Sequence, residues 1–147
     1  FAAAPHLQIT TQACPLFVEF VEAGITHGPE LERVAGEYLD PVREAGVDTL
    51  VLGCTHYPLL TGVISYVMGE EVTLVSSAEE TAQDVYRVLA RSDLMRDDAL
   101  PPPQHQFRST GDPRPFSKLG RRFLGPEVAS VEETTEIPVV GREATTR

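Results

Sequence analysis

The sequence predicts an α/β fold with mostly parallel sheets and flanking helices. The basis for this prediction is the alternation of strand-like and helix-like segments along the chain. VDTLVLG (47–53) is a short apolar run, typical of a strand buried on both faces of a parallel sheet, and VTLVSS (72–77) repeats the pattern. Because a helical pattern follows each run, the chain is expected to build βαβ units with right-handed crossovers.

One strand and two helices are predicted before the first of these runs. LQITTQA (7–13) alternates apolar and polar residues like a strand. Pro15 then opens a short helix that Gly24 is expected to stop. A longer helix is predicted over 29–46, where Pro41 should kink or divide it.

Two further helices are predicted on either side of the 72–77 strand. YPLLTGVISYVMG (57–69) carries apolar residues at helical spacing. Ser77 and Glu80 have the S-x-x-E spacing of a capping box, which predicts the start of the second helix. The apolar stripe of that helix is expected to be buried and consists of Val85, Val88 and Leu89.

The C-terminal part of the sequence predicts one more strand and one more helix. LPPPQ (100–104) is a proline-rich spacer, followed by a strand over 105–112 and a helix over 113–125. Beyond that helix the sequence has no sustained period and is rich in acidic residues. Residues 126–147 are therefore expected to form a disordered tail.

Bulk composition narrows the class of protein. A formal charge of -10 disfavours direct binding to nucleic acid, whose phosphates would be repelled over most of the surface. The hydrophobic content of 41%, with no apolar run of membrane-spanning length, predicts a soluble cytoplasmic protein without membrane association.

The two cysteines form no C-x-x-C pair and suggest no disulfide framework. The first residue is Phe1 and not Met, which suggests an upstream portion.

LVLGCTHYPLL (50–60) places a cysteine and a histidine at the end of a predicted strand, where ligands bind in parallel α/β sheets. A helix opening near Pro58 would aim unpaired N–H groups and the positive end of its dipole at this turn, which suits a carboxylate or phosphate. The same field and a nearby imidazole favour the thiolate form of Cys54. The hydroxyl of Thr55 can donate to a bound carboxylate, and His56 can hold or pass a proton.

The residues alone leave three interpretations of Cys54 open: a buried thiol, a metal ligand, or a nucleophile or base. Metal binding is the weakest, because only Cys54 and His56 are available locally and structural zinc needs four ligands. A hydrolase nucleophile would also need an orienting residue and an oxyanion hole. Cys14 precedes Pro15, which has no N–H to offer an anion, so Cys14 is interpreted as structural.

LVLGCTHYPLL closely resembles the second cysteine motif of the glutamate racemases, the isomerases of the aspartate/glutamate racemase family that supply D-glutamate for peptidoglycan. Three other stretches resemble the same family in the right order: ACPLFVEFVEAG, VTLVSSAEETA and STGDPRPFSKLGRRFLG. The resemblance covers roughly residues 7–125 and is closest to actinobacterial members. It implies two α/β domains facing each other across a cleft, with residues 1–75 in the second (middle) domain and 76–125 returning to the first.

The resemblance also implies a two-base mechanism that uses neither a cofactor nor a metal. One cysteine thiolate removes the Cα proton of glutamate, and the thiol of a second cysteine delivers a proton to the opposite face. By motif, Cys54 matches the second catalytic cysteine, while Thr55 and His56 match residues that bind substrate and assist that cysteine. Glu22, in FVEAG, matches an acidic residue near the active site, with a solvated surface acid as the alternative.

Further implications of the resemblance concern partners and completeness. It implies a homodimer with a part in cell wall biogenesis and cell shape; the alternatives are an aspartate-type racemase or an acidic protein-binding role such as gyrase inhibition. The family's N-terminal motifs, an Asp-Ser pair and an Asn-Thr motif around the first cysteine, are absent here. Cys14 matches only the non-catalytic ACP motif. The chain is therefore expected to be roughly the C-terminal half of a racemase and inactive alone.

Overall fold

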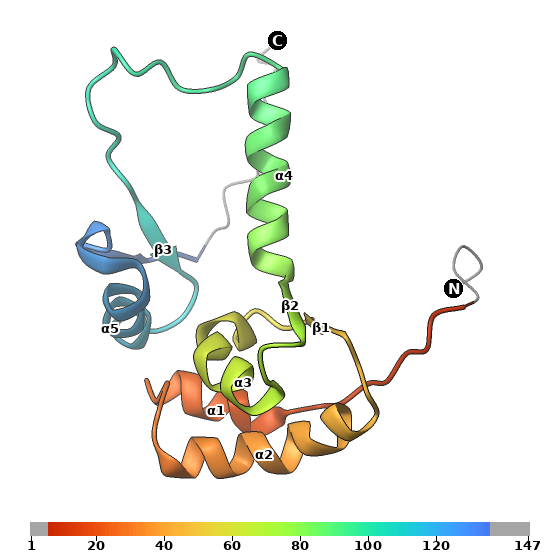
Figure 1. The fold of residues 1–147 in the computed structure, drawn as a ribbon. Coiled ribbons are helices and arrows are strands. Elements are labelled where there is room, and N and C mark those ends of the chain that lie inside the picture. The colour runs from red at the N-terminus through yellow and green to blue at the C-terminus, as the bar shows by residue number, and fades with distance from the viewer. Residues whose placement is uncertain (1–5, 136–147) are drawn as a thin grey trace. The chain divides into compact units, whose positions relative to one another are not determined.

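The computed structural model describes residues 6–135, and the chain divides into two compact units, Phe1–Asp97 and Asp98–Arg147. Figure 1 shows α1, α2 and α3 of the first unit gathered together, with α4 leading away from them after β2. The elements of the first unit are α1 (Pro15–Glu22), α2 (Pro29–Glu44), β1 (Thr49–Leu52), the 3-10 helix η1 (Tyr57–Leu60), α3 (Thr61–Met68), β2 (Thr73–Ser76) and α4 (Ser77–Arg91).

The core of the first unit lies where α1, α2 and α3 pack against one another and against the end of β1. Within it, Phe17 and Leu31 are almost completely removed from solvent. The buried hydrophobic residues of this unit are Cys14, Phe17, Val21, Leu31, Val34, Ala35, Leu39, Val42, Leu52, Leu60, Val63, Ile64 and Met68. They recur at helical spacing on α1, α2 and α3, so hydrophobic burial fixes which face each helix turns inward.

Strands β1 and β2 form the parallel pair that the sequence predicts. Thr49 lies opposite Thr73, and Leu52 lies opposite Ser76. The chain between them passes through η1 and α3, which makes a βαβ unit and confirms that part of the prediction. The hydroxyl of Ser77 donates to the carbonyl of Leu52 at 3.1 Å, which ties the start of α4 to the end of β1.

Helix boundaries in the first unit follow the predicted start and stop signals closely. Pro15 and Pro29 occupy the first turns of α1 and α2, and Gly24 and Gly46 follow the two helices at φ of 73° and 72°. Glycine suits these positions because positive φ strains residues that carry a Cβ. Pro41 was expected to kink or divide the second helix. It does not divide the helix, because α2 runs without a break from Pro29 to Glu44 with Pro41 inside it.

Two strand predictions differ from the structure in the first unit. Residues 7–13 form no strand in the part of the chain that the structure describes, because β1 pairs only with β2 and leaves this segment without a hydrogen-bonded neighbour. The run 47–53 does form β1, but not with both faces buried: Val51 is 63% exposed. The apolar pattern predicts the strand correctly and overestimates how much of it is covered.

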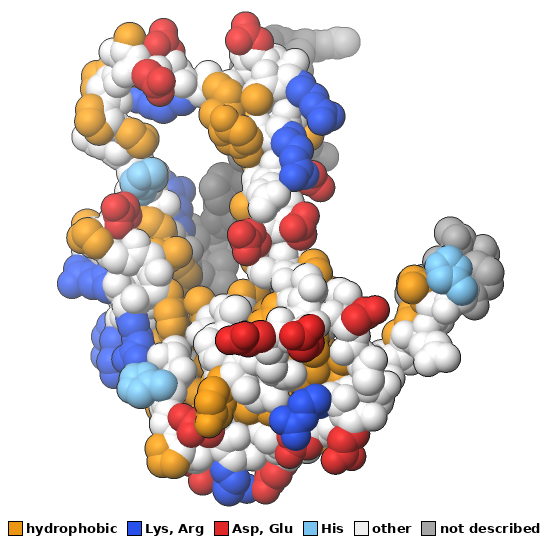
Figure 2. Space-filling model, in the orientation of Figure 1, with side chains coloured by type: hydrophobic (Ala, Val, Ile, Leu, Met, Phe, Trp, Pro, Cys, Tyr) orange, Lys and Arg blue, Asp and Glu red, His pale blue; other side chains and the backbone are white. Residues whose placement is uncertain are grey.

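Helix α4 also differs from its prediction. Its N-cap is Ser76, whose hydroxyl accepts from the Glu79 N–H at 3.3 Å, so the helix is capped one residue earlier than the Ser77–Glu80 pair predicts. The expected burial of Val85, Val88 and Leu89 is wrong: α4 has no buried residue, and Val85 and Val88 are more than half exposed. Figure 2 shows hydrophobic side chains at the surface along α4. No other described element of the first unit covers its apolar stripe.

The second unit contains another parallel pair. Its elements are β3 (Phe107–Ser109), α5 (Pro113–Leu124), the 3-10 helix η2 (Gly125–Glu127) and β4 (Val131–Glu133). The strand and helix that the sequence predicts over 105–112 and 113–125 are confirmed in type. Asp112 caps α5 by accepting from the Arg114 N–H at 3.0 Å.

Residues 126–147 were expected to form a disordered tail, and this prediction is wrong for the part up to residue 135, which contains β4. β4 pairs with β3 in parallel, with Phe107 opposite Val131. Val128 is fully buried against α5, where a Cβ at Gly120 would come within 3.2 Å of it, and Arg121 donates to the Val128 carbonyl at 3.0 Å. Packing on α5 therefore orders a segment whose own composition gives no such signal. Residues 136–147 lie outside the described residues.

Among the helices of residues 6–135, none combines the length and the apolar character needed to cross a membrane.

Candidate active site

Cys54 lies just beyond the carboxyl end of β1, in the turn that leads to η1. β1 ends at Leu52, Gly53 follows, and the turn 54–56 precedes η1. The carboxyl end of a parallel strand is the edge of the sheet at which α/β proteins bind ligands. The Cys54 side chain is partly exposed, and its thiol has no hydrogen-bond partner among the described residues. It is therefore open to an incoming ligand.

Three of the predicted site residues form one chain of contacts beside that thiol. His56 Nε2 lies 2.7 Å from Oε1 of Glu22, the last residue of α1. His56 Nδ1 lies 3.3 Å from the hydroxyl of Thr55. Glu22 and His56 are 34 positions apart in the sequence, so the packing of α1 against η1 brings them together.

The contacts assign the proton on a neutral His56 ring. An ionised carboxylate can only accept, so Nε2 carries the proton and donates it to Glu22. Nδ1 then accepts from the Thr55 hydroxyl. If His56 gains a second proton at Nδ1, the Thr55 oxygen becomes the acceptor and its hydroxyl proton is free for another group. The state of the imidazole therefore decides where the Thr55 hydroxyl donates.

The Glu22–His56 pair acts mainly through orientation. The Glu22 side chain is 58% exposed and that of His56 is 28% exposed. An ion pair in such contact with water contributes little to folding stability, about 0–1 kcal/mol. A short contact at this position nevertheless holds the imidazole ring in one plane and one tautomer, as outer partners do for catalytic histidines.

The predicted anion cradle is smaller than the sequence suggests. The segment that was expected to start a regular helix near Pro58 begins as the 3-10 helix η1, and α3 starts only at Thr61. The Leu59 N–H already donates to the His56 carbonyl at 3.0 Å, and Pro58 has no N–H. Two of the first N–H groups are therefore unavailable to a ligand, which leaves the side chains of the turn with a larger share of any anion binding.

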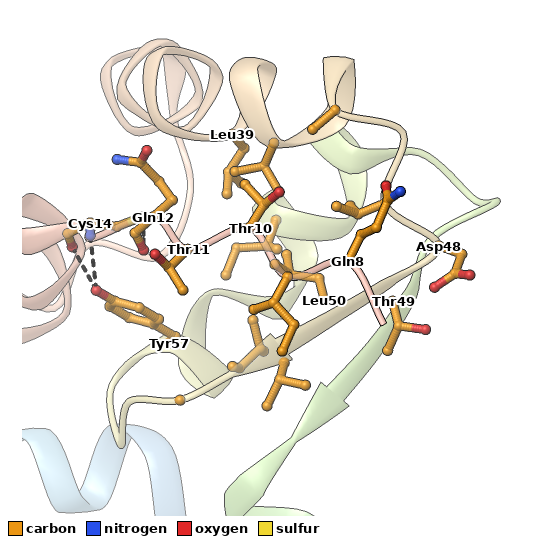
Figure 3. Close-up of a pocket in the computed structure, with 18 of the residues that line it drawn as sticks. Gln8, Thr10, Thr11, Gln12, Cys14, Leu39, Asp48, Thr49, Leu50 and Tyr57 are labelled. Carbon is orange, nitrogen blue, oxygen red and sulfur yellow. Dashed lines mark hydrogen bonds between the residues drawn. The ribbon is translucent and has the colours of Figure 1, made fainter. Parts of the chain in front are cut away.

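A cavity of about 720 Å³ runs from Cys54 along one side of β1. Figure 3 shows residues 8–12 along one wall, with Leu50 of β1 and Leu39 of α2 facing them. Cys54 and Tyr57 line this cavity, whereas Glu22, Thr55 and His56 do not. Cys54 is thus the residue of the polar turn that also lines the cavity.

Cys14 has the buried setting expected of a structural cysteine. Its side chain is 3% exposed, and burial raises the pKa of its thiol from 9.0 to about 11. A thiol with so high a pKa is almost entirely protonated at neutral pH and is a poor base. The structure thus separates the two cysteines by environment: Cys14 is in the core, and Cys54 is at an open strand end.

The raised pKa predicts that Cys14 makes folding stability depend on alkaline pH. The folded state holds the thiol proton more tightly than the unfolded state, so this stabilisation is complete below pH 9 and is lost as the pH rises towards 11. Urea unfolding of the protein and of its Cys14→Ala variant at pH 8, 9, 10 and 11 measures the effect. The free energy of unfolding should fall more steeply for the wild type, by at most roughly 2 kcal/mol over the range. Parallel pH curves for the two proteins would contradict this assignment.

Sequence reasoning missed one residue next to the site. The hydroxyl of Tyr57 contacts both the N–H and the carbonyl of Cys14, each at 3.1 Å. The two residues are 43 positions apart, and the only signal in the sequence is that Tyr57 directly follows the Cys54–His56 turn.

Within residues 6–135, no group of three or more His, Cys, Asp or Glu side chains has an arrangement that could hold a metal ion.

Curated relatives match the chain over most of its length. It is 65% identical over 131 residues to the glutamate racemase of Acidothermus cellulolyticus, which covers 89% of this chain and 50% of the relative. It is 56% identical over 134 residues to the glutamate racemase of Corynebacterium glutamicum, with 90% and 49% covered. The chain thus spans about half the length of the curated relatives it matches. No family model matches it.

Solved structures lead to the same family. A glutamate racemase isoform from Bacillus anthracis superposes with a TM-score of 0.76 at 31% identity, over 95% of this chain and 51% of that one. The Francisella tularensis glutamate racemase in complex with D-glutamate gives 0.75 at 29% identity, over 88% and 48%. By sequence and by fold, the chain is a homologue of the glutamate racemases and spans about half of their length.

Proposed function

We propose that the whole protein interconverts L- and D-glutamate, and that this chain supplies the base for one face of the substrate. The observation that carries the proposal is the Cys54 turn: an accessible thiol at the carboxyl end of β1, followed directly by Thr55 and His56, with His56 bonded to Glu22 at 2.7 Å. High identity to proteins that carry the name glutamate racemase supports the choice of substrate.

In the proposed mechanism, Cys54 acts as a thiolate or a thiol according to the direction of reaction. As a thiolate it removes the Cα proton, and a thiol on the opposite face delivers a different proton to the same carbon. In the reverse direction Cys54 delivers the proton and the other group removes one. Two bases are needed because a single base tends to return its proton to the face from which it came. The second base is proposed to lie in a part of the protein outside these 147 residues.

Thr55 and His56 are proposed to bind the substrate and to assist Cys54. A protonated His56 would release the Thr55 hydroxyl to donate to the substrate carboxylate, as the contacts of the imidazole permit. Fixed donors of this kind stabilise the negative charge that develops as Cα loses its proton. Glu22 is proposed to hold the imidazole in place and does not itself touch substrate.

The chain is proposed to be one half of the catalytic unit, inactive alone. The open side of β1, where Val51 is 63% exposed, and the uncovered stripe of α4 both support this proposal, because apolar surface of this extent calls for a covering element. We assign residues 1–75 to a middle domain and 76–125 to a segment that returns to the first domain, on the resemblance described above.

The resemblance to glutamate racemases also underlies the proposed cellular setting. The protein is proposed to work in the cytoplasm as a homodimer, to need no cofactor, and to supply D-glutamate for peptidoglycan and so for cell shape.

A substrate panel tests the proposed reaction. The whole protein is incubated separately with the L and D forms of glutamate and aspartate, and the change in optical rotation is followed. Glutamate should be racemised from both directions, with aspartate about 10-fold to 200-fold slower, because a pocket built for the longer side chain loses binding contacts with the shorter one. Faster racemisation of aspartate would replace glutamate with the aspartate-type alternative. Turnover by the isolated chain would contradict the claim that it is incomplete.

A further inference from the structure

Helix α1 begins without a side chain of its own to cap it. Its N-cap residue is Cys14, which makes no side-chain capping bond, and Pro15 follows. The Tyr57 hydroxyl binds the backbone of that residue from another part of the chain: it accepts from the Cys14 N–H and donates to the Cys14 carbonyl, each at 3.1 Å (Figure 3). In the first turn itself, the Leu16 N–H donates to the Tyr38 hydroxyl at 3.5 Å. One phenol therefore holds both polar groups of the residue at which α1 starts.

The ring of Tyr57 is fixed by aromatic packing. It meets Phe17 edge-on with ring centroids 5.6 Å apart, and Phe17 meets Tyr38 in the same way at 5.5 Å. Phe17 is 1% exposed, so this contact lies in the core. Burial raises the pKa of the Tyr57 phenol, which keeps its proton available to donate to the Cys14 carbonyl. The hydroxyl is thus presented to Cys14 by a side chain with little freedom to move.

Two adjacent residues, the last of the turn and the first of η1, contact the two ends of the same helix. Tyr57 holds Cys14 at the start of α1, and His56 holds Glu22 at its last residue. The helix has eight residues, so the two attachment points are about 12 Å apart along its axis. Core packing of Phe17 and Val21 fixes which face of α1 turns inward, and the two attachments add a constraint on its position along the axis.

We propose that Tyr57 is a positioning residue, whose hydroxyl keeps α1 aligned with the Cys54 turn so that the Glu22 carboxylate meets His56. The Tyr57 hydroxyl bonds to the Cys14 backbone and not to a side chain of the turn, so its effect on catalysis is proposed to pass through Glu22. The catalytic part of this inference rests on the proposed glutamate racemase function, while the structural part does not.

A double-mutant cycle in the whole protein tests the inference. Tyr57→Phe keeps the ring and its packing and removes only the hydroxyl, so kcat for glutamate racemisation should fall roughly fivefold to tenfold. Glu22→Gln should cost more, and the double variant should be no slower than Glu22→Gln alone, because Tyr57 acts through that carboxylate. Tyr66→Phe is the matched control, because it also removes one phenol hydroxyl. Tyr66 lies on α3 and is 77% exposed, so removing its hydroxyl should leave kcat unchanged.

Losses that multiply in the double variant, or a Tyr57→Phe variant with full activity, would overturn the proposal. A second measurement does not depend on activity: long-range ¹H–¹⁵N spectra of the whole protein report the tautomer of its histidine rings, that of His56 among them. One ring should be held as the Nε2–H form in the wild type and in Tyr66→Phe, and should lose that restriction in Tyr57→Phe and in Glu22→Gln. An unchanged ring in Tyr57→Phe would overturn the inference. If the wild type failed to racemise glutamate, the proposed function would be wrong. The spectra would still test whether the Tyr57 hydroxyl positions Glu22 against His56.

Discussion

Replacing Cys54 with serine in the whole protein should reduce kcat for glutamate racemisation by about 100-fold to 10,000-fold in both directions, the range that a positioned base contributes. A serine hydroxyl holds its proton far more tightly than a thiol does, so the variant loses the base while keeping nearly the same shape. Because Cys54 serves one face in each direction, neither enantiomer should escape the loss. Polarimetry from pure L- and pure D-glutamate measures both rates.

The matched control for this substitution is Cys14→Ala, which removes the other thiol of the chain. Cys14 is 3% exposed and has a pKa of about 11, so its loss should lower stability and leave kcat within about twofold of the wild type at a temperature where both are folded. A Cys54→Ser variant with wild-type rates, or a Cys14→Ala variant that folds and does not turn over, would contradict the assignment of the two cysteines.

Glu22→Gln is expected to reduce kcat roughly 10-fold to 100-fold with a smaller change in KM. Glutamine matches glutamate in size, but its amide can donate as well as accept, so it no longer restricts His56 to the Nε2–H form. The imidazole then loses both its fixed tautomer and the carboxylate that balances its charge when it is protonated. Steady-state kinetics of the purified whole protein measure the change.

Glu19→Gln is the matched control, because it makes the same chemical change on the same helix. Glu19 is an exposed acid one turn earlier on α1 and has no ion pair to His56, and its substitution removes the same single negative charge. Its variant should behave like the wild type. Equal losses in the two variants would mean that general surface charge, and not the contact with His56, accounts for the effect, and the orienting role of Glu22 would be wrong.

Local signals in the sequence predict most elements of the fold. Proline at the first turn, glycine after the last, and apolar residues at helical spacing place α1 and α2 within one or two residues. The apolar run ending at Gly53 predicts β1 and puts Cys54 at its carboxyl end, which is where the structure has it. These features depend on residues close together in the chain, so the sequence carries them directly.

Burial and pairing were predicted less well, because they depend on what else is nearby. The stripe of Val85 and Val88 has the spacing of a buried helix face, yet no other element among the described residues of the first unit covers it. β4 forms on β3 from a segment with no strand pattern, because α5 holds Val128 beneath it. Spacing shows which residues can be buried together and does not show whether a partner is present.

The candidate site divides in the same way. The turn 54–56 could be found from its position after a strand, whereas Glu22 came from the family resemblance, and only the structure places its carboxylate 2.7 Å from His56. Tyr57 gave no signal, because its partner Cys14 is 43 positions away and is bonded through backbone atoms. Contacts between a side chain and a distant backbone leave no mark on local composition.

The most direct test of the proposed two-base reaction is racemisation of L-glutamate by the whole protein in deuterium oxide, with the Cα label of both enantiomers followed by mass spectrometry at low conversion. Newly formed D-glutamate should carry solvent deuterium at Cα while the remaining L-glutamate carries almost none, because the group that removes the proton is not the group that replaces it. D-glutamate that retains the original Cα proton would contradict a mechanism in which Cys54 serves only one face.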